Sequence, residues 1–274
     1  MSKTKIPWAT DVWNPTVGCT KVSAGCKNCY AERIFERFHP GEKFSNVHYL
    51  PGKIDDPLYW KRPRRIFVDS MSDLFHRSID QPTIAKVFAI MAVARWHTYM
   101  ILTKRPERMI DILGNLAFDK DIELWQEQIC FEQGWCSQDF EYPLPNVWLG
   151  VSVEDQKTAD ERIQLLLQTP AAVRFVSVEP MLEEVDLDKY EFLCETWSKG
   201  GITIGTYLDW VIAGCESGPG ARPMDLDWAR SLRDQCQAAS APFFLKQAQI
   251  DGKLVKMPEL DGKVWDEYPI KEKR

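Results

Sequence analysis

The sequence predicts an α/β protein built on a full or partial (β/α) barrel of the TIM type. Short apolar, β-branched runs alternate with longer segments of helical period from about residue 65 onward. Strands separated by helices indicate a parallel sheet with crossover connections. About six such units suit one barrel domain over residues 1–274 better than two separate domains. A doubly wound open sheet is the alternative.

The apolar pattern gives the expected elements in order. We expect strands, each a short run of large apolar residues, at about 11–17, 66–69, 98–103, 147–153, 173–178, 210–213 and 243–245. Helices are expected at 82–94, 106–113, 159–167 and 228–239, with one more starting near Tyr30. Pro82 suits the first turn of its helix, with Asp80 or Gln81 as the cap.

Three stretches break this alternation. Residues 114–146 look like an insertion between two units of the sheet. Residues 183–209 lack a clear helical period and end in a glycine-rich turn at Gly200-Gly201. The part from about 249 to 274 is expected to form an irregular C-terminal cap.

The composition of the chain indicates where the protein resides and leaves its partners open. No run of about 18 apolar residues exists, so we expect no membrane span, and the first residues lack the apolar core of a secretion signal. We therefore expect a cytoplasmic protein. The net charge of −6 gives no general attraction to a polyanion, although the basic run 61–65 is a local exception. Composition leaves the partner and the oligomeric state open.

The eight cysteines are unevenly spaced. Cys19, Cys26 and Cys29 fall within eleven residues, in a glycine-containing loop (18–30) that follows the first expected strand. In a reducing compartment such clustering points to metal or redox chemistry. A structural zinc site needs four ligands, so a distant fourth ligand such as Cys215 or a histidine would be required. A [4Fe-4S] cluster held by three thiolates would leave one iron open for a ligand.

Polar residues follow the expected strands at the point where each strand ends. In a barrel of parallel strands these ends lie on one rim, where function resides. The rim would then carry mixed charge and suit a polar small molecule such as an amino acid or nucleoside. Its candidate residues are Asp69, Ser70, Lys104, Ser152, Glu154, Glu179, Cys215, Glu216 and Lys246.

The cysteine loop resembles a variant of the radical S-adenosylmethionine (SAM) cluster motif. The spacing here is C-x6-C-x2-C, against the usual C-x3-C-x2-C, and Asn28 stands where that motif has an aromatic residue. A closer resemblance covers nearly the whole chain, through Trp-Asn-Pro…Gly-Cys-Thr-Lys-Val-Ser…Asn-Cys-Tyr-Ala-Glu, Val-Ser-Val-Glu, Ser-Val-Glu-Pro and Glu-Ser-Gly-Pro-Gly-Ala-Arg-Pro. It is to a phage- and bacterium-associated three-cysteine family of unknown function. That family is distantly similar to spore photoproduct lyase and has Gly where this chain has Cys215.

The resemblance implies a barrel of the radical SAM kind and its cofactors. A [4Fe-4S] cluster on Cys19, Cys26 and Cys29 would cleave SAM reductively and generate a 5′-deoxyadenosyl radical. By strand position, Asp69 and Ser70 would contact the SAM amino group, Lys104 its carboxylate, and Ser152 and Glu154 its ribose. Cys215, Glu179 and Glu216 would be catalytic, with Cys215 as a hydrogen-atom donor. A flavodoxin- or ferredoxin-like reductant protein is expected, and a nucleic acid or nucleoside is the suggested substrate.

Two other interpretations remain open from the sequence. One is a zinc- or cluster-stabilised phage-associated binding protein without radical chemistry, because zinc offers no redox chemistry. The other is a non-radical hydrolase that uses Glu154, Glu179 and Glu216 as acid and base.

Overall fold

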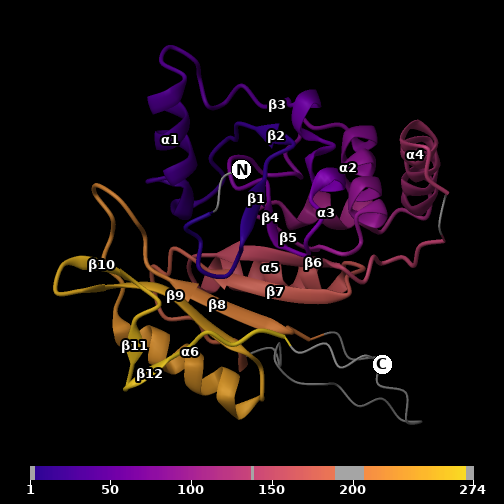
Figure 1. The fold of residues 1–274 in the computed structure, drawn as a ribbon. Helices are drawn as coiled ribbons and strands as arrows, with labels where there is room; N and C mark the ends of the chain where they lie inside the picture. The colour runs from indigo at the N-terminus through magenta and orange to yellow at the C-terminus, as the bar shows by residue number, and fades with distance from the viewer. Residues whose placement is uncertain (1–3, 137–138, 189–206, 270–274) are drawn as a thin grey trace, which may run out of the picture. The chain divides into compact units, whose positions relative to one another are not determined.

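The computed structural model describes residues 4–136, 139–188 and 207–269. It has a mixed α/β fold with an eight-stranded sheet in the order β1-β4-β5-β6-β7-β8-β9-β10 (Figure 1). The chain forms two compact units. The first comprises residues 1–22, 29–149 and 169–172, and the second comprises 23–28, 150–168 and 173–274. The expectation of one domain over 1–274 stays a prediction.

The first unit contains the start of the sheet. Strands β1 (Asp11–Trp13), β4 (Arg65–Val68) and β5 (Thr98–Thr103) pair in parallel. The single strand expected at 11–17 is wrong, because β1 ends at Trp13 and β2 (Thr16–Val17) pairs instead with β3 (His48–Tyr49) in a separate sheet. Pro15 lies between β1 and β2 and has no N–H to continue the first ladder.

The described residues of the first unit form the α-helices α1 (Tyr30–Phe38), α2 (Gln81–Val93), α3 (Pro106–Leu113) and α4 (Phe118–Gln133). The predicted cap is confirmed, because the Asp80 carboxylate accepts a hydrogen bond from the backbone N–H of Thr83 at 2.9 Å. The stretch expected as an insertion contains α4, which lies beside α2 (Figure 1). The rings of Phe88 and Phe118 meet edge to face with their centroids 5.4 Å apart.

The second unit contains the end of the sheet. Strand β6 (Val147–Val153) is divided between the units and belongs to this one from Gly150 onward. The next strands are β7 (Val173–Val178), β8 (Trp210–Gly214) and β9 (Phe243–Ile250). Strand β8 pairs in parallel with both β7 and β9. Its helices are α5 (Gln156–Gln168) and α6 (Leu226–Ala238). The short 3-10 helix η1 (Ala24–Cys26) also belongs here.

The C-terminal part is more regular than expected. Strand β10 (Lys253–Lys256) pairs antiparallel with β9, and β11 (Glu259–Leu260) pairs with β12 (Lys263–Val264). The expected turn at Gly200-Gly201 lies outside the described residues.

The strand order decides between two of the predicted architectures. From β4 to β9 each new strand is added on the same side of the previous one, without the reversal that defines a doubly wound sheet. All seven residues of β6 are buried, as expected for a strand covered on both faces. The α/β class with a mostly parallel sheet is confirmed, and the TIM-type barrel stays a prediction. In the described part of the chain, no helix is long and apolar enough to cross a membrane.

Candidate functional site

The predicted site residues belong to both units. The first unit contains Cys19, Cys29, Asp69, Ser70 and Lys104, and the second contains Cys26, Ser152, Glu154, Glu179, Cys215, Glu216 and Lys246. In each unit the polar residues of this set follow, or lie within, the strands of the parallel sheet.

In the first unit Cys19 and Cys29 pack against the same small hydrophobic cluster, formed by Ala31, Phe35 and Phe44. Neither cysteine is in a disulfide, and both are partly exposed. The backbone of Gly18 adopts φ +91°, and an added Cβ would lie 2.7 Å from the carbonyl oxygen of Phe44. This position therefore requires glycine, which fixes the path of the chain into Cys19.

A guanidinium lies beside Cys19. Arg105 donates hydrogen bonds from Nη2 to the Thr20 carbonyl oxygen at 2.9 Å and to Thr20 Oγ1 at 3.0 Å, and the same nitrogen lies 3.9 Å from Cys19 Sγ. Asp73 holds this end of β5, since it accepts from Thr103 Oγ1 at 2.7 Å and lies 3.7 Å from Arg105 Nε. Arg105 thus places a positive charge beside the Cys19 sulfur.

Asp69 lies directly after β4 and is 4% exposed. Both of its carboxyl oxygens bond to Thr16: Oδ1 to the backbone N–H at 3.0 Å and Oδ2 to the hydroxyl at 2.9 Å. Burial raises the pKa of Asp69 to about 8, although the Thr16 hydrogen bonds oppose this. The carboxyl group therefore holds the segment that leads to Cys19.

Ser70 and Lys104 have backbone or hydroxyl contacts inside the first unit. Ser70 Oγ donates to Asn14 Oδ1 at 3.1 Å, and its carbonyl oxygen accepts from the Tyr30 hydroxyl at 2.6 Å. The backbone N–H of Lys104 donates to Asp73 Oδ2 at 3.1 Å, and the residue is partly exposed. Ser70 thus connects the end of β4 to the first residue of α1.

In the second unit the turn that contains Cys26 is attached to Glu154. Ser23 Oγ donates to Glu154 Oε1 at 2.7 Å. Gly25 approaches the same carboxylate so closely that an added Cβ would overlap it. Glu154 is fully buried, and Arg162 compensates its charge with Nη1 at 3.3 and 3.2 Å from the two carboxylate oxygens.

Glu216 holds the other end of the same turn. Its Oε2 accepts from Asn28 Nδ2 at 2.8 Å and from the Arg222 backbone N–H at 2.9 Å, while Oε1 bonds to Arg222 Nη2 at 2.5 Å. Burial alone would raise the pKa of Glu216, but the hydrogen bonds from Arg222 and Asn28 outweigh it and lower this pKa to about 2. Glu216 is therefore ionised at neutral pH.

Glu179 forms an ion pair with Lys246, whose Nζ lies 2.5 Å from Glu179 Oε1. The two side chains are 18% and 14% exposed, so the pair is accessible from solvent. Ser152 Oγ donates to the Glu179 carbonyl oxygen at 2.9 Å, which connects β6 to the end of β7.

Cys215 is fully buried after β8, and its backbone exchanges hydrogen bonds with Gln247. Burial raises the pKa of the Cys215 thiol to about 11, with nearby Glu179 as a further cause. The thiol therefore keeps its proton at neutral pH.

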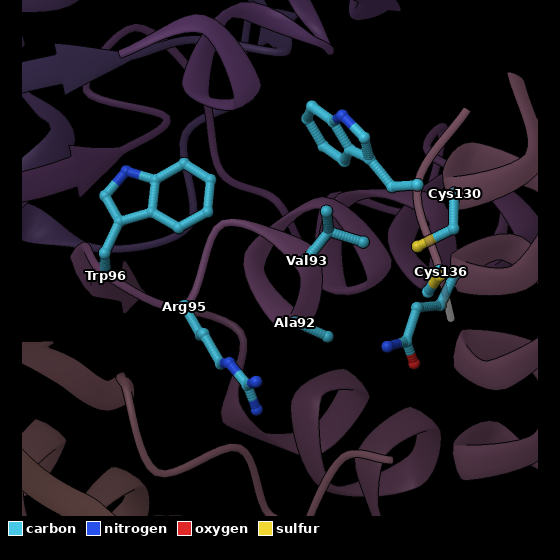
Figure 2. Close-up of a pocket in the computed structure, with 8 residues that line it drawn as sticks. Ala92, Val93, Arg95, Trp96, Cys130 and Cys136 are labelled. Atoms are coloured by element: carbon cyan, nitrogen blue, oxygen red, sulfur yellow. The ribbon is translucent and has the colours of Figure 1, made fainter. Parts of the chain in front are cut away.

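Two cavities of the first unit are lined by other residues. One of about 380 Å³ is lined by residues of α2 and α4 and the segments after them, including Arg95, Trp96, Cys130 and Cys136 (Figure 2). Arg95 and Trp96 precede β5, so this cavity is at the amino end of that strand, opposite Thr103. Another, of about 300 Å³, is lined in part by Asn14. None of the candidate site residues predicted from the sequence lines either cavity.

Sequence reasoning missed several residues of these networks: Ser23, Asn28, Asp73, Arg105, Arg162 and Arg222. Ser23, Asn28 and Arg222 lie in the runs quoted for the family resemblance. Asp73 and Arg105 follow β4 and β5 within a few residues, so proximity to a strand end was a usable signal for them. Arg162 lies within α5, whereas Glu154 precedes that helix, so no helical spacing pointed to their contact.

The donor set was compared with the chemistry of an iron–sulfur cluster. Three partly exposed thiols that are not in disulfides, one of them beside a guanidinium, fit thiolate ligation. Within the described ranges, no group of three or more His, Cys, Asp or Glu side chains is arranged so that it could hold a metal ion. Cys26 belongs to the second unit, and Cys19 and Cys29 belong to the first.

The chain was compared with known proteins. A family described as "Protein of unknown function (DUF5131)" matches residues 3–269. No curated protein and no solved structure matches the chain at a significant level.

Proposed function

We propose, for a chain that belongs to the DUF5131 family of unknown function, that it is a radical SAM enzyme with its cluster on Cys19, Cys26 and Cys29. One observation carries the proposal. Three partly exposed thiols that are not in disulfides lie within the loop 18–30. In each unit, residues that follow the parallel strands contact the part of this loop that belongs to the same unit. A partial TIM-type barrel of the radical SAM kind is the architecture that goes with this proposal.

Residues of the chain would bind the cluster and SAM. The three thiolates would hold the cluster and leave one iron open, and the bound cofactors would supply reductive cleavage of SAM. Lys104 would bind the SAM carboxylate, and Ser70 and Ser152 its amino group and ribose. Asp69, which is buried and bonded to Thr16, would act on SAM through the position of the Cys19 segment.

The second unit offers groups for the substrate. The Glu179–Lys246 pair is partly exposed and would bind a polar group or move a proton at Glu179 Oε1 or Lys246 Nζ. The Cys215 thiol holds its hydrogen at neutral pH, as a hydrogen-atom donor must. Glu154 and Glu216 have their oxygens engaged by arginine, serine and asparagine donors, which argues against a hydrolase that uses them as acid and base.

A nucleic acid or nucleoside substrate stays a prediction, as does a flavodoxin- or ferredoxin-like reductant. The basic run 61–65 does not support nucleic acid binding at the site, because it precedes β4 while Asp69 follows that strand. Arg64 is moreover engaged by Asp11 at 2.6 Å and stacks on Trp60 at 4.5 Å.

The experiment is reductive cleavage of SAM by anaerobically purified protein. With dithionite and SAM, the wild type should release 5′-deoxyadenosine and methionine, and a Cys26→Ala variant should release neither. A Cys136→Ser variant is the matched control, because Cys136 is exposed and outside the loop. No 5′-deoxyadenosine from a protein that contains zinc would favour a metal-stabilised binding protein instead.

A further inference from the structure

The turn around Cys26 has few contacts of its own. It is the 3-10 helix η1, whose preceding residue Ser23 makes no side-chain cap hydrogen bond. Within the turn, the backbone N–H of Cys26 donates to the Ser23 carbonyl oxygen at 3.0 Å, and that of Lys27 donates to the Ala24 carbonyl oxygen at 3.2 Å. A single 3-10 turn does not hold its shape in water unaided.

Two carboxylates of the second unit provide the missing contacts. Glu154 accepts from the Ser23 hydroxyl, on the N-terminal side of Cys26, and Gly25 packs against it. Glu216 accepts from the Asn28 amide on the C-terminal side. Cys26 is thus held between two anchored residues, Ser23 and Asn28.

Each carboxylate is itself fixed by an arginine. Arg162 bonds to Glu154 and, at 2.5 Å, to the Ser152 carbonyl oxygen. Arg222 bonds to Glu216 and also donates from Nη2 to the Ala24 carbonyl oxygen at 3.0 Å. Charge-assisted hydrogen bonds of this kind are stronger and more directional than neutral ones, so the anchors are rigid.

From these contacts we propose that Glu154 and Glu216 are positioning residues, which hold the Cys26 turn in one conformation before any metal is bound. The inference rests on the proposed function for the identity of the metal group. The contacts that position the Cys26 turn do not depend on the identity of the metal group. Neither glutamate is a catalytic residue in this account, since each acts through the Cys26 turn.

The test uses the full-length, metal-free protein. Alkylation of Cys26 by iodoacetamide and hydrogen exchange of a peptide covering residues 23–28 are compared in the wild type, Glu154→Gln and Glu216→Gln. Each variant should speed Cys26 alkylation by about tenfold and deprotect the peptide, because one charged anchor is weakened. Glu161→Gln is the matched control, because Glu161 lies on α5 next to Arg162 but pairs with exposed Lys157. This variant should leave the alkylation rate and the hydrogen exchange unchanged.

A second pair of variants removes only the loop side of each contact. Ser23→Ala and Asn28→Ala leave the buried carboxylates paired with arginine. They therefore test the positioning role even if a glutamine variant fails to fold. They should also slow the uptake of iron and sulfide during reconstitution. Wild-type alkylation and exchange in Ser23→Ala and Asn28→Ala, or a wild-type rate of iron uptake, would overturn the inference.

The two proposals fail in different ways. A chain that never cleaves SAM can still show a Cys26 turn that depends on Glu154 and Glu216. Conversely, if neither glutamine variant changes the alkylation or the exchange of the Cys26 turn, the positioning role of the two glutamates is wrong. The proposal that the chain cleaves SAM is not affected by that result.

Discussion

Glu154 accepts a hydrogen bond from the Ser23 hydroxyl at 2.7 Å, across 131 residues of chain. Glu154 follows β6, and Ser23 lies three residues before Cys26. A carboxylate predicted to contact bound SAM is therefore in contact with the loop proposed to hold the cluster. Its full burial means that it acts on the turn and not directly on solvent-borne molecules.

Glu216 should make stability depend on pH in the acid range. Its folded pKa of about 2 lies below the ordinary value of 4.5, so its stabilisation is complete above pH 4.5 and is lost as the pH falls toward 2. We expect Glu216→Gln to lower the free energy of unfolding by about 1.5–3 kcal/mol at pH 7, and by less at pH 3. Urea unfolding of both proteins at the two pH values measures this. An equal difference at both pH values would contradict it.

Asp69 should make the stability of the protein depend on pH in the opposite direction. Its folded pKa is raised from 3.8 to about 8, so the stability of the wild type falls as the pH rises between these values. In Asp69→Asn the slope should disappear, and the variant should be more stable than the wild type at pH 8.5. Asparagine tolerates the φ of +57° at this position. Thermal unfolding from pH 5 to 8.5 measures this dependence. If the stability of the variant changed with pH as the wild type's does, this explanation would be wrong.

Gly25 should not tolerate a side chain. A Cβ there would overlap the Glu154 carboxylate, which Arg162 and Ser23 prevent from moving aside. Gly25→Ala should cost about 1–3 kcal/mol of stability and loosen the Cys26 turn. The matched control is Gly52→Ala, where an added Cβ meets nothing within 4 Å. Equal stability of the two variants in urea would show that the approach of Gly25 to Glu154 is not constrained.

Cys215 and Cys136 should differ sharply in thiol reactivity. Cys215 is fully buried, with its pKa raised to about 11, whereas Cys136 is exposed. At pH 8 iodoacetamide should alkylate Cys136 at least about a hundredfold faster, because only the accessible thiolate reacts. Mass spectrometry of timed digests follows both sites, and alkylation of Cys215 at a similar rate would show that it is open to solvent.

The sequence predicted the elements of the sheet well and its side-chain contacts poorly. The strands at 98–103, 147–153 and 173–178 have the bounds that the apolar runs indicated, because buried parallel strands are nearly continuous in hydrophobicity. The strand at 11–17 was wrong because Pro15 ends the ladder, a local rule that the apolar pattern does not contain.

For the site, the sequence indicated which residues follow the strands but not what they contact. Glu154 and Glu216 were singled out by position alone. Their partners Ser23 and Asn28 are more than 100 residues away in the chain, and no spacing rule connects them. Such contacts depend on tertiary structure, so they became visible only with the fold.

The central claim is a [4Fe-4S] cluster with one iron open to SAM, and EPR spectroscopy tests it most directly. Anaerobically purified protein, reduced with dithionite, should give the signal of a reduced [4Fe-4S] cluster, with about four irons per chain. Adding SAM should change that signal. A cluster signal indifferent to SAM, or zinc in place of iron, would contradict the claim.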